Sequence, residues 1–427
     1  MSKNGSQGRA IALLPILVFL CIFLGSGVIT GDFYSMPAIV AFLIALTVAF
    51  AQNRDLKFAD KIKLAAEGVG DENIITMCLI FLAAGAFSGA VKAAGGVEST
   101  VNLGLSILPS GMAVAGLFVI GCFISISMGT SVGTITALAP IAAGISEKTG
   151  FSMAICAGAV VGGAMFGDNL SMISDTTIAA VKTQGCEMKD KFRENFMIIL
   201  PAAIITVIIF LVLGQNAAYA VEGDLEYNIF KVLPYLVVLI GALIGINVFA
   251  ILITGTALSL IVGLVTGAFT GAEMFVHVGN GIMGMYDITV ISMIVACIVA
   301  LVKEYGGIEF VLSFIKRRIN DEKGGELGIA ALALLVDACT ANNTVAIVMA
   351  GPIAKEISND FGVTPRRSAS LLDMFSSMGQ GLIPYGAQLL AAASLTGLTP
   401  FDIIPYCYYP LLMGVSGLVF IFIKKRK

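Results

Sequence analysis

Charged residues are scarce in this sequence: Asp, Glu, Lys and Arg make up 12% of 427 residues, where an average soluble domain has about 25%. The sequence has no tryptophan and one histidine, and its eight cysteines are scattered without a Cys-x-x-Cys or Cys/His spacing. This pattern argues against a zinc or disulfide framework. The sequence also shows no nucleophile-and-base pair and no metal-ligating group of the kind that would indicate an enzyme. The composition also excludes a disordered protein and a nucleic-acid-binding protein, and we expect no cofactor.

Apolar sequence is abundant instead, since hydrophobic residues make up 58% of the chain. About 20 apolar residues cross a bilayer, so this length predicts an integral membrane protein with roughly ten spans. The first apolar run, 10–30, is long for a signal peptide and lacks a clear A-x-A cleavage site. We therefore interpret it as an uncleaved first helix.

The positions of the apolar and basic residues predict a topology. Ten apolar runs read as spans: 11–30, 36–51, 72–91, 152–186, 196–214, 228–245, 248–266, 283–302, 367–397 and 403–423. Two further stretches, 110–146 and 327–357, do not fit as simple spans. Basic clusters occur at 3–9, 54–63, 189–193, 316–323, 366–367 and 424–427. All of them are cytoplasmic if both termini are cytoplasmic and each extra stretch is a re-entrant hairpin, as expected of a multi-pass protein of the inner (cytoplasmic) cell membrane.

Two halves of the sequence repeat each other. Residues 91–98 recur as 302–309 at an offset of 211, and residues 139–146 recur as 351–358 at an offset of 212. Residues 1–215 and 216–427 would then each contain five spans and one hairpin. Because five is odd, the second half enters the membrane from the opposite face. Inverted repeats of this kind are typical of secondary transporters, which bind their substrates at the midplane between the repeats.

Polar clusters interrupt the apolar sequence at matching places in the two halves. Residues 125–134 and 337–344 are the predicted hairpin tips, and 167–177 and 379–388 interrupt the long segments 152–186 and 367–397. A continuous helix over either long segment would overrun a bilayer core of about 30 Å, so we expect a break at the midplane. Unwound backbone at that depth persists where it is buried or lines a cavity, and its free oxygens can replace the water shell of a cation.

Carboxylates inside these segments are the central candidates. Asp168 and Asp175 lie in the first break, Asp337 lies one turn before the second tip, and Asp373 precedes the second break. No Lys or Arg lies in the middle of these segments to pair with them. A buried carboxylate costs several kcal/mol unless it is paired, protonated or bound to a cation. One interpretation is that these groups only hold helices together; the other is a site where a cation and a proton compete for one carboxylate.

We expect one shared site built from both tips and both breaks. Its ion- or substrate-binding candidates are Thr130, Ser131, Thr134, Asp168, Asn169, Ser174, Asp175, Thr176, Asp337, Asn342, Asn343, Thr344, Asp373, Gln380 and Gln388, with Pro384 beside them. Asp168, Asp175 and Asn343 are the expected sodium ligands. Oxygen ligands of this kind suit a hard cation.

The segment Gly129–Thr134 (GTSVGT), followed by Gly158–Thr177 (GAVVGGAMFGDNLSMISDTT), resembles the signature of the NhaC-type sodium/proton antiporter family. The likeness spans most of the chain, although the family usually has Ser-Pro in place of Ser171-Met172 and often Pro-Trp-Asn in place of Pro384–Gly386. The family is placed in the ion transporter superfamily, whose members resemble elevator-type transporters and are usually homodimers. The resemblance implies an all-α polytopic protein that exchanges sodium for protons.

Other transport functions remain open at this point. Relatives in that family are thought to move malate and lactate or amino acids, so the alternative is sodium- or proton-coupled transport of a small organic solute such as an amino acid. A dicarboxylate is less favoured because no mid-membrane Arg is present to clamp it, although the dipoles of half-helices could compensate. A channel or membrane enzyme is the weakest alternative.

Overall fold

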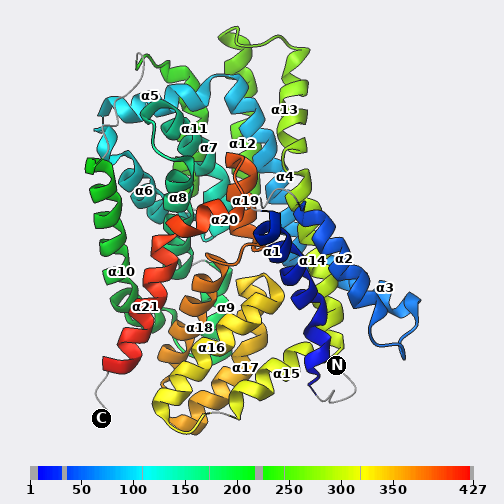
Figure 1. Ribbon diagram of the computed structural model, residues 1–427. Helices are drawn as coiled ribbons and strands as arrows, with labels where there is room; N and C mark the ends of the chain where they lie inside the picture. Colours follow the sequence, from blue (N-terminus) through cyan, green and yellow to red (C-terminus); the bar gives the residue numbers. More distant parts are fainter. Residues whose placement is uncertain are drawn as a thin grey trace.

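Helices are the regular structure of the part of the chain that the computed structural model describes, and no strand occurs within it (Figure 1). The described residues are 8–30, 36–107, 109–172, 174–216, 225–244, 246–317 and 319–423. The all-α prediction is therefore confirmed for them. The chain ends, whose cytoplasmic placement is predicted, lie outside the described residues, as do Lys3, Arg318, the basic cluster 424–427 and most of the loop between 216 and 225.

The first half contains ten α-helices among its described residues. Their bounds are α1 Leu14–Thr30, α2 Ala38–Ala51, α3 Phe58–Val69, α4 Glu72–Ala93, α5 Gly96–Ile107, α6 Ala113–Met128, α7 Ser131–Thr149, α8 Met153–Leu170, α9 Asp175–Gln184 and α10 Met188–Asn216. Short 3-10 turns precede α1 at Ala10–Leu13 and α6 at Ser110–Met112.

The second half contains eleven α-helices among its described residues. Their bounds are α11 Ile229–Leu243, α12 Val248–Val265, α13 Glu273–Met283, α14 Tyr286–Glu304, α15 Gly307–Lys316, α16 Glu322–Thr340, α17 Asn343–Phe361, α18 Pro365–Gln380, α19 Ala387–Thr396, α20 Pro400–Ile403 and α21 Tyr408–Ile423. A 3-10 turn, Ile404–Tyr406, separates the last two.

Two helix pairs with very short tips cover most of the two stretches predicted to be re-entrant hairpins. Gly129, whose φ is 67°, follows the last residue of α6, and Thr130 caps α7 by accepting the Gly133 N–H at 3.3 Å. Ala341, whose φ is 50°, follows the last residue of α16, and Asn342 caps α17 by accepting the Val345 N–H at 3.0 Å. The pairs run from Ala113 to Thr149 and from Glu322 to Phe361, beside the predicted stretches 110–146 and 327–357, whose re-entrant course stays a prediction.

Both long segments consist of two helices. Helix α8 ends at Leu170 and α9 begins at Asp175, whereas α18 ends at Gln380 and α19 begins at Ala387; we call these interruptions the first and the second break. In each case the second part packs against the other half: α9 lies against α17 and α18, whereas α19 lies against α7 and α8. Figure 1 shows α6, α7 and α8 toward one end of the molecule and α16, α17 and α18 toward the other, so the breaks meet between them.

Long apolar helices give the chain the character of a multi-pass membrane protein. Four helical stretches among the described residues are long and apolar enough to span a membrane: Ile74–Ala93, Met153–Gln184, Met188–Gln215 and Val248–Val265. Two bent helix pairs bring this number to six, and five shorter apolar helices accompany them. The polytopic character agrees with the sequence prediction, while the count of ten spans stays a prediction.

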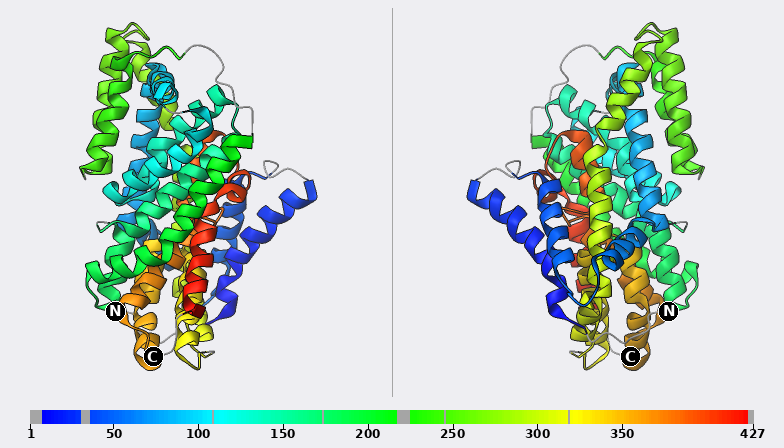
Figure 2. Two further views of the ribbon diagram at one scale, coloured as in Figure 1. Left: turned by 90° about the vertical axis from the view of Figure 1, so that its left-hand side faces the viewer. Right: turned by 90° about the vertical axis from the view of Figure 1, so that its right-hand side faces the viewer.

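A second group of helices lies along one side of this core. Helices α1, α2, α3, α4, α12, α13 and α14 pack mainly on one another, and α4 and α5 contact α7 (Figure 2). The large buried apolar cluster of the molecule spans both hairpins and both broken helices. The polar breaks are therefore enclosed by packed helices.

Candidate functional site

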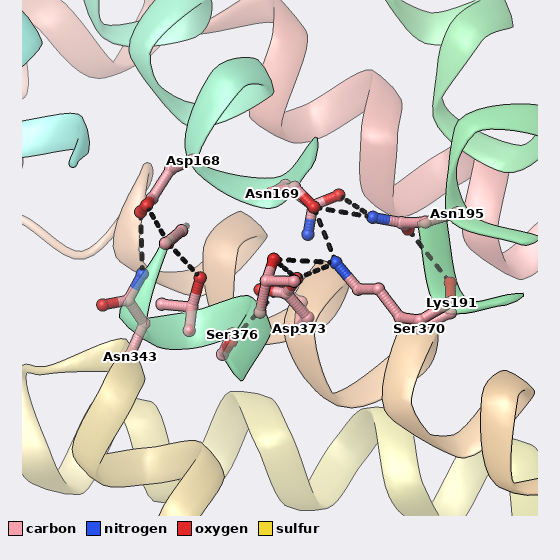
Figure 3. Close-up of polar contacts among 11 residues, drawn as sticks. Asp168, Asn169, Lys191, Asn195, Asn343, Ser370, Asp373 and Ser376 are labelled. Carbon is pink, nitrogen blue, oxygen red and sulfur yellow. Dashed lines mark hydrogen bonds and ion pairs between the residues drawn. The ribbon is translucent and has the colours of Figure 1, made fainter. Parts of the chain in front are cut away.

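Asp168 lies at the centre of the polar breaks, in the last turn of α8, with 4% of its surface exposed. Its carboxylate accepts hydrogen bonds from the Ser131 hydroxyl at 2.9 Å and the Ser174 hydroxyl at 2.5 Å. The Asn343 amide donates a third bond at 3.4 Å (Figure 3). Ser131 begins α7, Ser174 precedes α9 and Asn343 begins α17. One carboxylate thus joins the first tip, the first break and the second tip.

Two glutamines connect the second break to the same group. The Gln388 amide donates to the Ser131 hydroxyl at 3.0 Å, and the Gln380 amide donates to the Gln388 side-chain oxygen at 2.7 Å. Gln380 also donates to the carbonyl of Ala341 at 3.0 Å. All four polar clusters therefore meet through side chains that are at least nine-tenths buried.

A polar cavity of about 480 Å³ opens beside Asp168. Most of the predicted site residues line it: Thr130, Ser131, Asp168, Ser174, Asp175, Thr176, Asn342, Asn343, Thr344, Gln380 and Gln388. The described lining residues include three carboxylates, of Glu72, Asp168 and Asp175, and no Lys, Arg or His. Asp175 and Glu72 are exposed, whereas Asp168 is buried. The cavity is therefore acidic, with its most enclosed carboxylate at Asp168.

Four predicted residues lie outside the cavity lining. The Thr134 hydroxyl donates back to the Thr130 carbonyl at 2.9 Å, within α7. Asn169 faces α10, where the Asn195 amide donates to its side-chain oxygen at 2.6 Å. Asp337 is fully buried on α16, and Asp373 is fully buried on α18. The structure thus does not bring these four residues to the Asp168 cavity.

Asp373 is held by a lysine that the sequence analysis placed in a cytoplasmic basic cluster. Lys191 is 1% exposed, and its ammonium group donates to the Asp373 carboxylate, to the Asn169 carbonyl at 2.7 Å and to the Thr177 hydroxyl at 3.0 Å (Figure 3). Lys191 lies outside the segments that carry the carboxylates, so the absence of Lys and Arg from the middle of those segments does not exclude a basic partner. Because α10 begins at Met188, Lys191 lies in its first turn and its long side chain extends inward to the first break.

Arg367 is a second basic residue that the sequence analysis placed at a helix end. It is 1% exposed, and its guanidinium group pairs with Glu326 at 3.1 Å and with Glu194 at 3.4 Å. Both acids lie on other helices, α16 and α10. A basic residue beside others of its kind looks like surface charge in a sequence, and no local pattern distinguishes the one that turns inward.

Comparison with known proteins gives a consistent picture. The profile of the Na+/H+ antiporter family matches residues 8–215 and 223–424. The Na+/H+ antiporter NhaC of Alkalihalophilus pseudofirmus is 24% identical, over 98% of this chain and 96% of its own length. The malate-2H+/Na+-lactate antiporter of Bacillus subtilis is 22% identical, over 94% and 92%. The arginine/ornithine antiporter ArcD of Halobacterium salinarum is 23% identical, over 76% and 74%.

Proposed function

Because the chain belongs to the Na+/H+ antiporter family and exchanges sodium for protons, we propose that both ions use the Asp168 cavity in turn. The observation that carries this proposal is one buried carboxylate bonded by side chains from both halves of the chain. The hydroxyls of Ser131 and Ser174 can rotate and offer oxygen lone pairs to a cation. With Asp168, Ser131, Ser174, Thr176 and the Asn343 carbonyl oxygen, the cavity can supply the five or so oxygens that a hard cation takes.

The charges around the cavity favour one monovalent cation. Four helices, α7, α9, α17 and α19, begin at residues that line it, and each N-terminus carries about half a positive charge. The C-terminal ends of α6, α16 and α18 line the same cavity and carry about half a negative charge each, so the helix ends largely cancel and the carboxylates keep the cavity negative. One sodium ion or one proton neutralises the buried carboxylate of Asp168.

Sodium and a proton compete for the Asp168 carboxylate, and this competition couples their movements. An empty, charged Asp168 is costly to move through the low-dielectric interior of a membrane, whereas the carboxylate bound to sodium or to a proton is neutral. The loaded forms cross and the empty form does not. Sodium moving in one direction therefore exchanges for a proton moving in the other.

An inverted repeat of 1–215 and 216–427 would supply the two-sided access that exchange needs. Hydrogen bonds that recur at an offset of 212 support it: the Ser146 hydroxyl donates to the Phe151 carbonyl at 2.7 Å, and the Ser358 hydroxyl donates to the Val363 carbonyl at 2.6 Å. Glycines with positive φ recur likewise at Gly150 and Gly362, and at Gly185 and Gly397.

In this proposal the hairpins and broken helices move as one body against the remaining helices, as in an elevator-type transporter. A second cavity of about 330 Å³ lies between the two groups, and apolar and charged residues of α3 and α14, Ile74 of α4 and the tip of α16–α17 line it. It supports relative movement there. A homodimer in the inner cell membrane, with both termini cytoplasmic, is part of the same proposal.

The experiment is sodium-driven proton movement in proteoliposomes. Asp168→Asn keeps the size of the side chain but cannot bind a proton or offer a charge, so exchange should be abolished. Asp175→Asn removes an exposed charge from the cavity and should raise the apparent KM for sodium five- to thirtyfold, from a loss of roughly 1–2 kcal/mol. Asp360→Asn, at an exposed carboxylate on α17, is the matched control. Normal exchange by Asp168→Asn would refute the site.

Transport of a small organic solute is the second candidate. The observation that favours it is the volume of about 480 Å³, which falls within the range of about 300–1,000 Å³ for small-molecule pockets. Relatives named as organic-solute antiporters support the same candidate. Three acidic and no basic side chains among the described lining residues favour an amino acid with a cationic group over a dicarboxylate. Counterflow with labelled amino acids and labelled malate separates these cases.

A further inference from the structure

Asp337 is a fully buried carboxylate that the Asp168 cavity does not use. It lies in the last turn of α16, its surface is 0% exposed, and neither carboxylate oxygen has a hydrogen-bond partner among the described residues. The ion pairs between described residues involve other acids. Buried polar groups are nearly always partnered, so a carboxylate without partners needs an explanation.

The energetics decide the protonation state of Asp337. An isolated charged carboxylate in a protein or membrane interior costs several kcal/mol or more, and a group in that position takes up a proton instead. The titratable side chains beside it are Cys339 on the same helix and Tyr385 after α18, both uncharged. The Tyr385 hydroxyl donates to the Ala338 carbonyl at 2.6 Å, so it does not serve Asp337. This burial without partners therefore favours the neutral, protonated form of Asp337.

The first half of the chain contains the neutral counterpart of Asp337. At an offset of 212, Asp337 corresponds to Ser125 and Gly379 corresponds to Gly167. A Cβ built on Gly379 would lie 2.7 Å from the Asp337 carboxylate, and one built on Gly167 would lie 2.3 Å from the Ser125 Cβ. Ser125 of α6 thus packs on Gly167 of α8 as Asp337 of α16 packs on Gly379 of α18.

The counterpart also indicates what the proton does. The Ser125 hydroxyl donates to the Ala164 carbonyl at 2.6 Å. A protonated Asp337 can donate in the same way, and the offset of 212 points to the carbonyl of residue 376 on α18. A charged Asp337 could not donate this bond, so a proton on Asp337 would join α16 to α18 as the Ser125 hydroxyl joins α6 to α8.

We propose that Asp337 is a second proton-binding site, separate from the Asp168 cavity, whose proton must stay bound for transport to proceed. This inference rests on the proposed exchange at Asp168. Asp337 lies one turn before the tip, since its carbonyl accepts the Ala341 N–H at 2.7 Å, and the Ala341 carbonyl accepts the Gln380 amide at 3.0 Å. Loss of the proton would drive α16 away from Gly379 and carry Asn343 away from Asp168.

The test is the pH dependence of sodium-driven exchange in proteoliposomes. Proton loss from Asp168 lowers exchange at alkaline pH in every variant, and loss of the Asp337 proton should add a further decline of up to about tenfold per unit in the wild type. Asp337→Asn and Asp337→Ser, which are neutral at every pH, should stay active and lack this additional decline. The serine variant reproduces the first half of the chain and guards against misfolding of the asparagine variant. Asp360→Asn, at an exposed carboxylate, should follow the wild type.

Infrared spectroscopy of the purified protein gives a readout besides activity. A carbonyl band of a protonated carboxylic acid should disappear at the pH where wild-type activity falls, and it should be absent from Asp337→Asn at every pH. A wild-type protein without such a band, variants whose activity falls as in the wild type, or folded variants without exchange would overturn the proposal. If exchange at Asp168 were wrong instead, Asp168→Asn would transport normally and the infrared result would be unaffected.

Discussion

At the scale of single residues, Lys191 and Asp373 form a pair of opposite charges in the protein interior, and both side chains are almost fully buried. The ammonium group uses its donors on Asp373, on the Asn169 carbonyl before the first break and on the Thr177 hydroxyl after it. A lysine therefore holds both sides of the break, much as a bound cation would. This arrangement positions the backbone on which Asp168 is mounted.

Removing only one partner of this pair should be costly. Lys191→Met leaves the Asp373 charge buried, and breaking a buried pair in this way costs about 3–5 kcal/mol. The double variant Lys191→Met/Asp373→Asn, which leaves no charge, should recover most of that loss. Unfolding in detergent measures the stability of both variants. Lys189→Met, at an exposed lysine two residues before Lys191 on the same helix, is the control. Equal stability of Lys191→Met and Lys189→Met would contradict the structural role.

The sequence predicts residues of the site through one signal, which is a polar side chain inside an apolar segment. Ser131, Asp168 and Asn343 interrupt apolar runs, and that signal located them. Thr134 and Asn169 carry the same signal, yet the rotation of their helices turns them toward other partners. Lys191 gave no signal, because the direction of a long side chain at a helix start depends on tertiary packing.

At the scale of elements, the two hairpin tips use the same left-handed turn with different residues. Gly129 adopts φ 67° without cost, whereas Ala341 adopts φ 50°, which strains a residue that has a Cβ. The breaks were predictable because an uninterrupted helix would be too long for the membrane. Short connecting helices such as α5 and α13 were not, since they lack the length of a span and their faces are defined by packing.

The strain at the second tip should be measurable. Ala341→Gly relieves an unfavourable left-handed conformation and should stabilise the protein by about 1 kcal/mol, less the entropy that glycine adds to the unfolded chain. Gly129→Ala, the reverse change at the first tip, should destabilise it by about 1–2 kcal/mol. Thermal unfolding in detergent compares the two. Opposite signs are expected, and a destabilising Ala341→Gly would show that the Cβ of Ala341 contributes packing that outweighs the strain.

At the scale of the whole molecule, the charge pattern predicts opposite sides of the membrane for two exposed acids. Glu226 is exposed and precedes α11, and Glu322 is exposed and begins α16; Figure 1 shows α11 and α16 toward opposite ends of the molecule. The positive-inside rule assigns the basic region 316–323 to the cytoplasm, so Glu226 should be outside. In a variant without the native cysteines, Glu226→Cys should react with a membrane-impermeant thiol reagent in intact cells, and Glu322→Cys should react only after the cells are opened. Labelling of Glu322→Cys in intact cells would contradict this topology, because the start of α16 would then face the outside.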